Sequence, residues 1–264
     1  MTRCDKCPRS AVIYQRYSGM HLCGEHFSMD VHRKIRERLR KTGLFSRGSR
    51  MAVCLDGGRQ SATLAWALKD IFSRRPDMDI SAIIIDPGER GGSCAEEGRA
   101  VAERLEMDCR ILSWPDGGAG IQFQEALFRA AQKAGAGILA TGECLDDEAL
   151  RIFLSYLQGE GRALLAAPSA GPATLTETSD HSRPEGPTWI KPLQRVPRRE
   201  ARLFALLHGL GIDADGGAGQ QCSLSQEAAR LLAGFEGRHP GTYYSLVRGL
   251  EKGLRAKPLS VDAK

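Results

Sequence analysis

The sequence predicts an α/β protein whose main domain is a parallel, doubly wound sheet, with a small cysteine-bearing module before it and helices after it. Two observations predict this architecture. From residue 50 onward, short apolar runs alternate with amphipathic segments of helical periodicity, whereas residues 1–27 are polar and contain three cysteines. Repeated strand–helix units form parallel sheets that helices cover on both faces. A chain of 264 residues is long enough to bury such a core.

Five apolar runs are expected to be strands, because they are short and rich in aliphatic residues. They are residues 51–55, 80–86, 109–114, 137–141 and 189–193. Helices are expected over 61–72, 95–107, 123–135, 146–159, 197–211, 225–237 and 243–256. The segments 160–187 and 213–221 are rich in Gly, Pro, Ser or Asp, and are expected to be loops.

Positive charge is concentrated at the start of the chain. The first 50 residues hold twelve Lys/Arg and four Asp/Glu, a net charge of +8, whereas the remaining 214 residues carry −3. Residues 29–42 place Val31, Ile35 and Leu39 on one stripe of a helix and basic residues around it. A basic module on a nearly neutral body favours an acidic partner such as nucleic acid, with a solvated helix face as the alternative.

Neither a membrane span nor a secretory signal is expected. No apolar stretch reaches the length of about 18 residues that a spanning helix needs, and the N-terminus lacks an apolar segment. Eight cysteines in such a chain therefore indicate metal ligands or reactive thiols, rather than a disulfide framework.

Two pairs of potential metal ligands lie near the N-terminus. Cys4 and Cys7 are separated by two residues, as are Cys23 and His26, and fifteen residues lie between the pairs. Two such pairs, joined by a hairpin over 10–22, supply the four ligands of a tetrahedral site. Three thiolates and one imidazole leave no open position for water, so the spacing predicts a structural Zn²⁺ site.

A Gly-rich turn follows the first predicted strand, in the sequence VCLDGGRQSATLAW. Small residues let backbone N–H groups point inward, and the start of the next helix adds partial positive charge, so the turn can hold an anion. Ser61 can add a hydroxyl and Arg59 a cation. The GK[ST] ending of a P-loop is absent, and a Gly-Gly turn can equally serve packing alone.

Three segments resemble motifs of the N-type ATP pyrophosphatases, and the first of them resembles the PP-loop. The turn is similar to S-G-G-x-D-S, with Asp56 at the first Ser and Gln60 at the Asp. The stretch ATGECLDDEA resembles A-T-G-H-N-L-D-D-E-A, with Glu143 and Cys144 at the His and Asn. The stretch WIKPLQRVPRRE resembles a later segment of the same proteins.

The order of these segments narrows the resemblance to the TtuA-type tRNA 2-thiolation proteins. The cysteine pairs, the basic helix, the PP-loop and then Cys222, followed by FEGRHPGTYYSLVRGLEKGL, occur in the order typical of that family. The resemblance covers nearly the whole chain. It implies four parts: a zinc-binding module (1–28), a basic linker helix (29–49), a PP-loop ATP pyrophosphatase domain (50–212) and a C-terminal helical segment (213–264).

The resemblance implies a Rossmann-like, adenine nucleotide alpha hydrolase-like core and an ATP-dependent tRNA sulfurtransferase in the cytoplasm. ATP with Mg²⁺ would adenylate a base carbonyl of tRNA, and a sulfur carrier protein or small sulfide donor would then supply sulfur. A homodimer is a further expectation. The residues that would hold phosphate, metal or nucleotide are Asp56, Gly57, Gly58, Arg59, Ser61, Asp86, Thr141, Gly142, Asp146 and Asp147.

Several residues depart from the family pattern. Asp56 brings a carboxylate toward the incoming phosphates, which weakens ATP binding unless Mg²⁺ or Arg59 compensates. Gln60 removes a carboxylate suited to Mg²⁺. TtuA-type members also carry a C-x-x-C before A-T-G-H-N that joins a late cysteine in holding an iron–sulfur cluster. The corresponding segment here has no cysteine and leaves Cys222 without those partners, so a cluster is doubtful.

Cys144 and Cys222 are the candidate catalytic thiols, because a two-thiol site can carry persulfide sulfur without a cluster. The alternative for Cys144 is simple packing beside the fourth strand. Cys109, at the start of a strand, is expected in the core.

Two further groups carry alternatives. Arg195, Arg198 and Arg199 fit either tRNA phosphate or solvent. Tyr243 and Tyr244 near Arg248 fit either base stacking or the core and its rim.

Two other functions compete with tRNA thiolation. The altered positions suit a catalytically degenerate paralogue that acts as a tRNA- or partner-binding subunit. They also suit a PP-loop enzyme that adenylates a small molecule, since a fold does not fix the substrate. The basic N-terminal segment favours a tRNA partner, because a small ligand needs no such surface.

Overall fold

The computed structural model describes residues 2–88, 93–114, 121–160, 186–210 and 223–255. A two-stranded hairpin, β1 (Ile13–Gln15) and β2 (Met20–Leu22), precedes a five-stranded sheet. The strands of that sheet are β3 (Arg50–Leu55), β4 (Asp79–Asp86), β5 (Cys109–Ser113), β6 (Ile138–Ala140) and β7 (Thr188–Ile190). The five predicted strands are therefore confirmed, with ends that shift by a few residues.

The five strands run parallel in the order β5-β4-β3-β6-β7, so β3 lies at the centre. Side chains alternate along β3: Met51, Val53 and Leu55 face one core cluster, while Ala52 and Cys54 face another. The sheet is thus covered on both faces, which confirms the doubly wound α/β architecture. The order reverses beside β3, where such folds bind ligands at the carboxyl ends of their strands.

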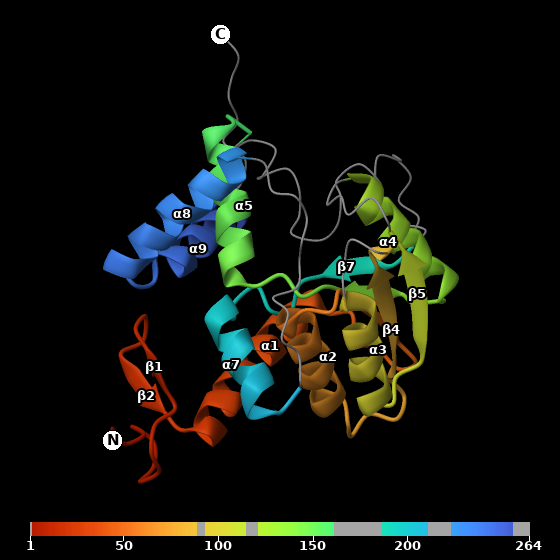
Figure 1. Cartoon of the computed structure of the whole chain (residues 1–264), viewed down its shortest axis with the longest axis horizontal. Helices are drawn as coiled ribbons and strands as arrows, with labels where there is room; N and C mark the ends of the chain where they lie inside the picture. Colours follow the sequence, from red (N-terminus) through yellow and green to blue (C-terminus); the bar gives the residue numbers. More distant parts are fainter. Residues whose placement is uncertain (1, 89–92, 115–120, 161–185, 211–222, 256–264) are drawn as a thin grey trace.

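Helices α1 (Gly24–Thr42), α2 (Arg59–Ile71), α3 (Cys94–Arg104) and α7 (Arg198–Leu207) contribute to the core on one face of the sheet. Helix α4 (Ile121–Lys133) covers the other face. Helix α5 (Leu145–Leu157) instead packs with α8 (Ser223–Arg238) and α9 (Thr242–Arg255), and the three stand beside the sheet in Figure 1. No helix among the described residues is both long and apolar enough to cross a membrane.

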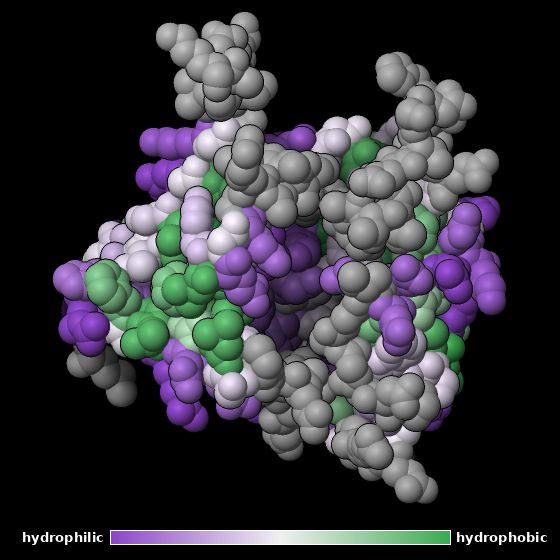
Figure 2. All heavy atoms as spheres, turned by 90° about the horizontal axis from the view of Figure 1, so that it is seen from above, coloured by the Kyte–Doolittle hydropathy of each residue, from purple (hydrophilic) through white to green (hydrophobic). Residues whose placement is uncertain are grey.

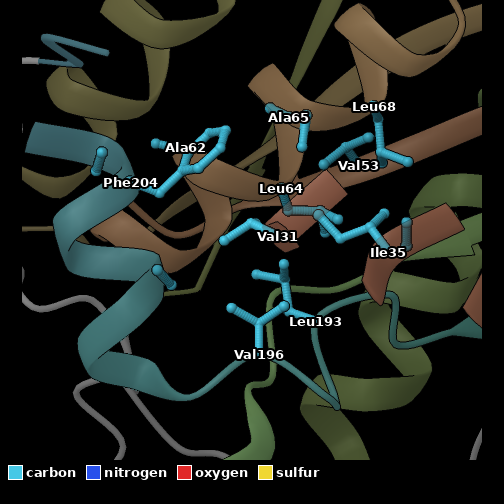
Figure 3. Close-up of a cluster of buried hydrophobic side chains, with 14 of the residues drawn as sticks. Val31, Ile35, Val53, Ala62, Leu64, Ala65, Leu68, Leu193, Val196 and Phe204 are labelled. Carbon is cyan, nitrogen blue, oxygen red and sulfur yellow. The ribbon is translucent and has the colours of Figure 1, made fainter. Parts of the chain in front are cut away.

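Helix α1 begins at Gly24, five residues before the start expected from the sequence. Its expected apolar stripe, Val31, Ile35 and Leu39, is buried. Figure 3 shows two of these residues beside side chains of α2, β3 and α7. The helix ends at Gly43, whose φ of 66° is a left-handed conformation that favours glycine. The basic helix is therefore part of the main core on one side and exposed on the other.

The expectation for Cys109 was wrong, because its side chain is exposed. It begins β5, which forms one edge of the sheet and carries mostly exposed residues. A strand at a sheet edge has a neighbour on one side only, so apolar content does not ensure burial. The expected loops 160–187 and 213–221, together with Cys222, lie largely or wholly outside the described residues.

Candidate functional site

The two predicted ligand pairs meet in one N-terminal cluster. The ligand atoms of Cys4, Cys7, Cys23 and His26 all lie within 4.8 Å of one another. The Cys7 and Cys23 sulfurs are 3.6 Å apart, and His26 Nδ1 lies 3.5 Å from the sulfur of Cys4 and 3.3 Å from that of Cys23. Zinc bonds of about 2.0–2.3 Å fit ligands at this separation. The donor set and its geometry therefore suit a closed tetrahedral Zn²⁺ site.

Local structure explains how the cluster forms. A tight turn brings Cys4 and Cys7 together, with the Cys7 amide donating to the Cys4 carbonyl at 3.4 Å. Cys23 is the N-cap of α1, so His26 lies in the first turn of that helix. Burial raises the pKa of the Cys4 thiol, but backbone hydrogen bonds at Cys23 and Lys6 outweigh it and bring the pKa to about 6. The thiolate that a metal requires is thereby favoured.

The Gly-rich turn lies at the carboxyl end of the central strand. Gly57 has a φ of 76°, and a Cβ added there would come within 2.5 Å of the Cys94 carbonyl oxygen. Gly58 is the N-cap of α2, whose first residue is the half-buried Arg59. Both the backbone conformation and the close approach of α3 therefore require glycine at position 57.

The carboxylate of Asp56 accepts hydrogen bonds from two donors of the turn. Its Oδ1 accepts a hydrogen bond from the Gly58 amide at 3.0 Å and another from the Ser61 hydroxyl. The side-chain oxygen of Gln60 is buried without a hydrogen-bond partner in the described structure. Two hydrogen-bond donors of the turn are thus bonded to a carboxylate of the protein itself.

Neighbouring strand ends bring further predicted residues to the same edge of the sheet. Asp86 ends β4, next to the central strand, and its carboxylate accepts from the Gly88 amide at 3.0 Å. Thr141 follows β6 and accepts a hydrogen bond from Trp189 Nε1 at 2.7 Å, so its hydroxyl is used in the core. Gly142 lies against the start of α2, where an added Cβ would be 3.0 Å from the Ser61 amide nitrogen. Figure 2 shows a hydrophilic hollow in the middle of the molecule, seen from above.

Asp146 and Asp147 connect the starts of two helices. The Arg198 amide, in the first turn of α7, donates to Asp146 at 2.7 Å, and the Arg198 guanidinium pairs with Asp147. The Cys144 amide also donates to Asp147, at 2.8 Å. Burial raises the pKa of Asp146. Both carboxylates therefore have a structural role in fixing α5 against α7, and Arg198 is committed to them rather than to solvent.

The structure describes one of the two candidate thiols, Cys144. Cys144 is fully buried, and burial raises the pKa of its thiol well above the usual value. These properties favour the packing alternative for Cys144, because the nucleophile is the thiolate. Cys222 lies outside the described residues. Sequence reasoning missed that Cys94 borders the Gly57 turn, since only the folded chain brings α3 to that position.

Comparison with known proteins agrees with these features. Residues 27–218 match the family described as the PP-loop domain, and residues 3–28 match the one described as the N-terminal LIM domain of the 2-thiouridine synthetase TtuA. The chain is 29% identical to the tRNA 2-thiolation protein NcsA of Haloferax volcanii, covering 94% of this chain and 86% of that protein. It is 25% identical to the tRNA-5-methyluridine(54) 2-sulfurtransferase of Pyrococcus horikoshii, covering 95% and 82%.

A solved structure has the same fold. The U34-tRNA thiolase NcsA from Methanococcus maripaludis, determined with its [4Fe-4S] cluster, superposes with a TM-score of 0.82 at 24% identity, covering 97% of this chain and 88% of that one. The PP-loop match alone extends over well more than half of the sequence. The protein belongs to the PP-loop domain family.

Proposed function

We propose that the protein is an ATP-dependent tRNA 2-thiolation enzyme. The observation that carries the proposal is the direct connection of a complete Cys/His metal module to a PP-loop domain, through the single helix α1. Two relatives that align over nearly the whole chain bear the names of tRNA thiolation proteins. The free cysteines of the described residues fit a reducing compartment, so we also propose a cytoplasmic location.

In the proposed reaction, the carbonyl oxygen of a tRNA base attacks the α-phosphate of ATP and pyrophosphate leaves. A sulfur carrier protein or a small sulfide donor then attacks the activated carbon, and the oxygen departs with AMP. The N-terminal end of α2 and the Ser61 hydroxyl would bind the phosphates. Asp86, at the end of β4 beside the central strand, would offer an oxygen ligand to the Mg²⁺ that accompanies ATP.

We propose Zn²⁺ as the metal of the N-terminal cluster, because its four ligands form a closed shell. Among the described residues, this cluster is the one group of three or more side chains that can hold a metal ion. The solved thiolase holds a [4Fe-4S] cluster, but the described residues here assemble no second cysteine group. None of the proposed steps requires a second cysteine group. The homodimer stays a prediction.

A second candidate function follows from Asp56. Its carboxylate takes up the Gly58 amide and the Ser61 hydroxyl, which an active cradle needs for phosphate. This contact supports a paralogue that binds tRNA without adenylating it.

One assay separates the two functions. Purified protein is incubated anaerobically with ATP, Mg²⁺, sulfide and an unmodified tRNA transcript, and AMP is quantified together with thiolated nucleosides by mass spectrometry. The enzyme hypothesis expects tRNA-dependent AMP and 2-thiolated product. Binding of tRNA in a filter assay without either product would contradict it and favour the paralogue.

A further inference from the structure

A large open cleft lies apart from the Gly-rich turn and the metal cluster. Its volume of about 770 Å³ is within the range of ligand sites. The turn between β1 and β2, helix α1, the end of α5, the segment before α7 and helix α9 form its walls. The lining residues on which the inference depends are Tyr17, Arg33, Tyr156, Arg195, Tyr244 and Arg248.

Positive charge predominates on the wall of this cleft. Four cations, Arg33, Lys34, Arg195 and Arg248, line it together with one carboxylate, that of Glu37. Lys34 is held from behind by Glu200 at 2.7 Å, and carboxylates also pair with Arg33 and Arg195. Arg248 is exposed and forms no ion pair within the part of the chain that the structure describes. An anionic ligand would therefore meet the Arg248 guanidinium, which no described carboxylate neutralises, and three cations that carboxylates hold in place.

The charge continues along the outer face of α1. Arg33, Arg36 and Arg40 are three or four residues apart and exposed, so they follow one side of the helix. Arg36 and Arg40 form no ion pair among the described residues. The cleft thus opens onto a basic helix face, which suits an extended polyanion better than a small ligand.

Three tyrosines line the same cleft as these cations, and contacts fix the orientation of two of them. Tyr17 and Tyr244 have ring centroids 4.7 Å apart. The Tyr17 hydroxyl donates to Glu200 at 2.7 Å and accepts from Lys34 at 2.6 Å, and the Tyr244 hydroxyl donates to the Arg195 carbonyl at 2.9 Å. The ring of Tyr156 is 58% exposed. Rigid rings beside cations are the surface on which unpaired nucleic-acid bases stack.

A smaller cavity adjoins the cleft at the start of α5. This cavity of about 230 Å³ shares Tyr17 and Pro240 with the cleft and includes Asp146 in its wall. Arg16 of the hairpin donates to the Gly237 carbonyl at 2.9 Å, which holds the hairpin against the end of α8. Figure 1 shows the hairpin on the same side of the molecule as α8 and α9. A strand lying in the cleft would therefore approach the start of α5.

We propose that this cleft is the docking surface for a single-stranded segment of tRNA. Arg248 and the outer face of α1 contact phosphates, while Tyr156 and the pair Tyr17 and Tyr244 stack on bases. The proposal rests on the proposed function for the identity of the RNA. It goes further in assigning binding to a surface outside the Gly-rich turn.

The test measures binding of an unmodified tRNA transcript to the full-length protein by fluorescence anisotropy, without ATP. Arg248→Glu reverses the free charge, and Tyr156→Ala removes an exposed ring. Arg110→Glu is the matched control, because Arg110 is exposed on β5 at the far edge of the sheet. We expect Arg248→Glu to weaken binding about tenfold and to reduce the salt slope by about one. Tyr156→Ala should weaken it at least about fivefold with the slope unchanged.

Each outcome decides the proposal. Circular dichroism must show that the variants keep the wild-type fold, which their exposed positions favour. Equal tRNA binding by Arg248→Glu, Tyr156→Ala and Arg110→Glu would overturn it and point to an acidic protein as the occupant. Wild-type protein without salt-dependent tRNA binding would overturn it as well. Failure of thiolation alone, with the variant effects intact, would contradict the proposed function and leave the docking surface supported.

Discussion

The N-terminal metal cluster and the Gly-rich turn both lie in turns that precede a helix. They differ in whether their donors are already bonded to another side chain. At the start of α1, all four ligand atoms converge, and among the described residues no side chain outside the cluster is bonded to them. At the start of α2, the Asp56 carboxylate already accepts hydrogen bonds from Gly58 and Ser61. The donors of the first site all face one another, whereas two donors of the second are already bonded to a side chain of the protein.

The two sites are expected to differ in how far folding depends on their ligands. A structural metal contributes directly to folding, so losing one ligand destabilises the whole module. A phosphate cradle contributes to function only when substrate binds, and its backbone persists without a ligand. Gly57 has a left-handed conformation, and Asp56 beside it accepts two hydrogen bonds within the same turn. The backbone of the turn is thus fixed by contacts of the protein itself.

The largest expected effect is loss of the metal. Cys23→Ala removes a ligand that is also the N-cap of α1 and is 2% exposed, within the main core cluster. We expect the metal content to fall from one zinc per chain to none and the free energy of unfolding to decrease by more than about 4 kcal/mol. Elemental analysis and urea denaturation measure the two quantities.

Cys109→Ala is the control for that experiment, because Cys109 is an exposed cysteine away from the cluster. It should leave both zinc and stability unchanged. A folded Cys23→Ala protein with wild-type stability would show that the first site is as dispensable to folding as the second, and would remove the contrast between them.

A smaller effect is expected from the buried network that joins the hairpin to the main domain. Glu200 is fully buried on α7 and accepts hydrogen bonds from Lys34 at 2.7 Å, Tyr17 at 2.7 Å and Gln15 at 3.1 Å. Glu200→Gln leaves the buried Lys34 ammonium with Asp30 as its remaining anion. We expect a loss of about 2–3 kcal/mol in the free energy of unfolding, because the buried ammonium keeps only one of its two carboxylates.

The same substitution at the exposed Glu227 is the matched control and should have almost no effect. A double variant, Glu200→Gln with Lys34→Met, should recover part of the loss, because it removes the uncompensated charge. If Glu200→Gln is as stable as Glu227→Gln by urea denaturation, the network does not couple the metal module to the domain.

How far the sequence predicts each region depends on whether its contacts are local. The Cys/His pairs and the Val31, Ile35 and Leu39 stripe follow from spacings of a few residues, and all of these residues lie where the pattern places them. The strands could also be predicted, because apolar runs between polar turns are a local signal.

Other features depend on contacts between distant parts of the chain. Glu200 and Lys34 are 166 residues apart, and no local pattern links them. The same reason explains Cys94, which borders Gly57 only because α3 folds back on the turn. Cys109 was misplaced because the edge position of β5 depends on strand order, which composition does not reveal. The carboxylate of Asp56 is a related case. The sequence predicts that it repels phosphate, but not that it accepts hydrogen bonds from Gly58 and Ser61.

The smallest of these effects tests the cradle itself. Asp56→Ser removes the charge and releases the Gly58 amide, so ATP affinity should rise about tenfold, measured by calorimetry with Mg²⁺. Asp56→Asn removes the charge but keeps an acceptor, and should give an intermediate affinity. Asp79→Ser is the control, since Asp79 is exposed at the start of β4, the end of that strand opposite the turn. An Asp56→Ser protein that binds ATP no better than wild type would show that the carboxylate does not compete with phosphate. The donors of the turn would then be as available to a ligand as those of the metal cluster.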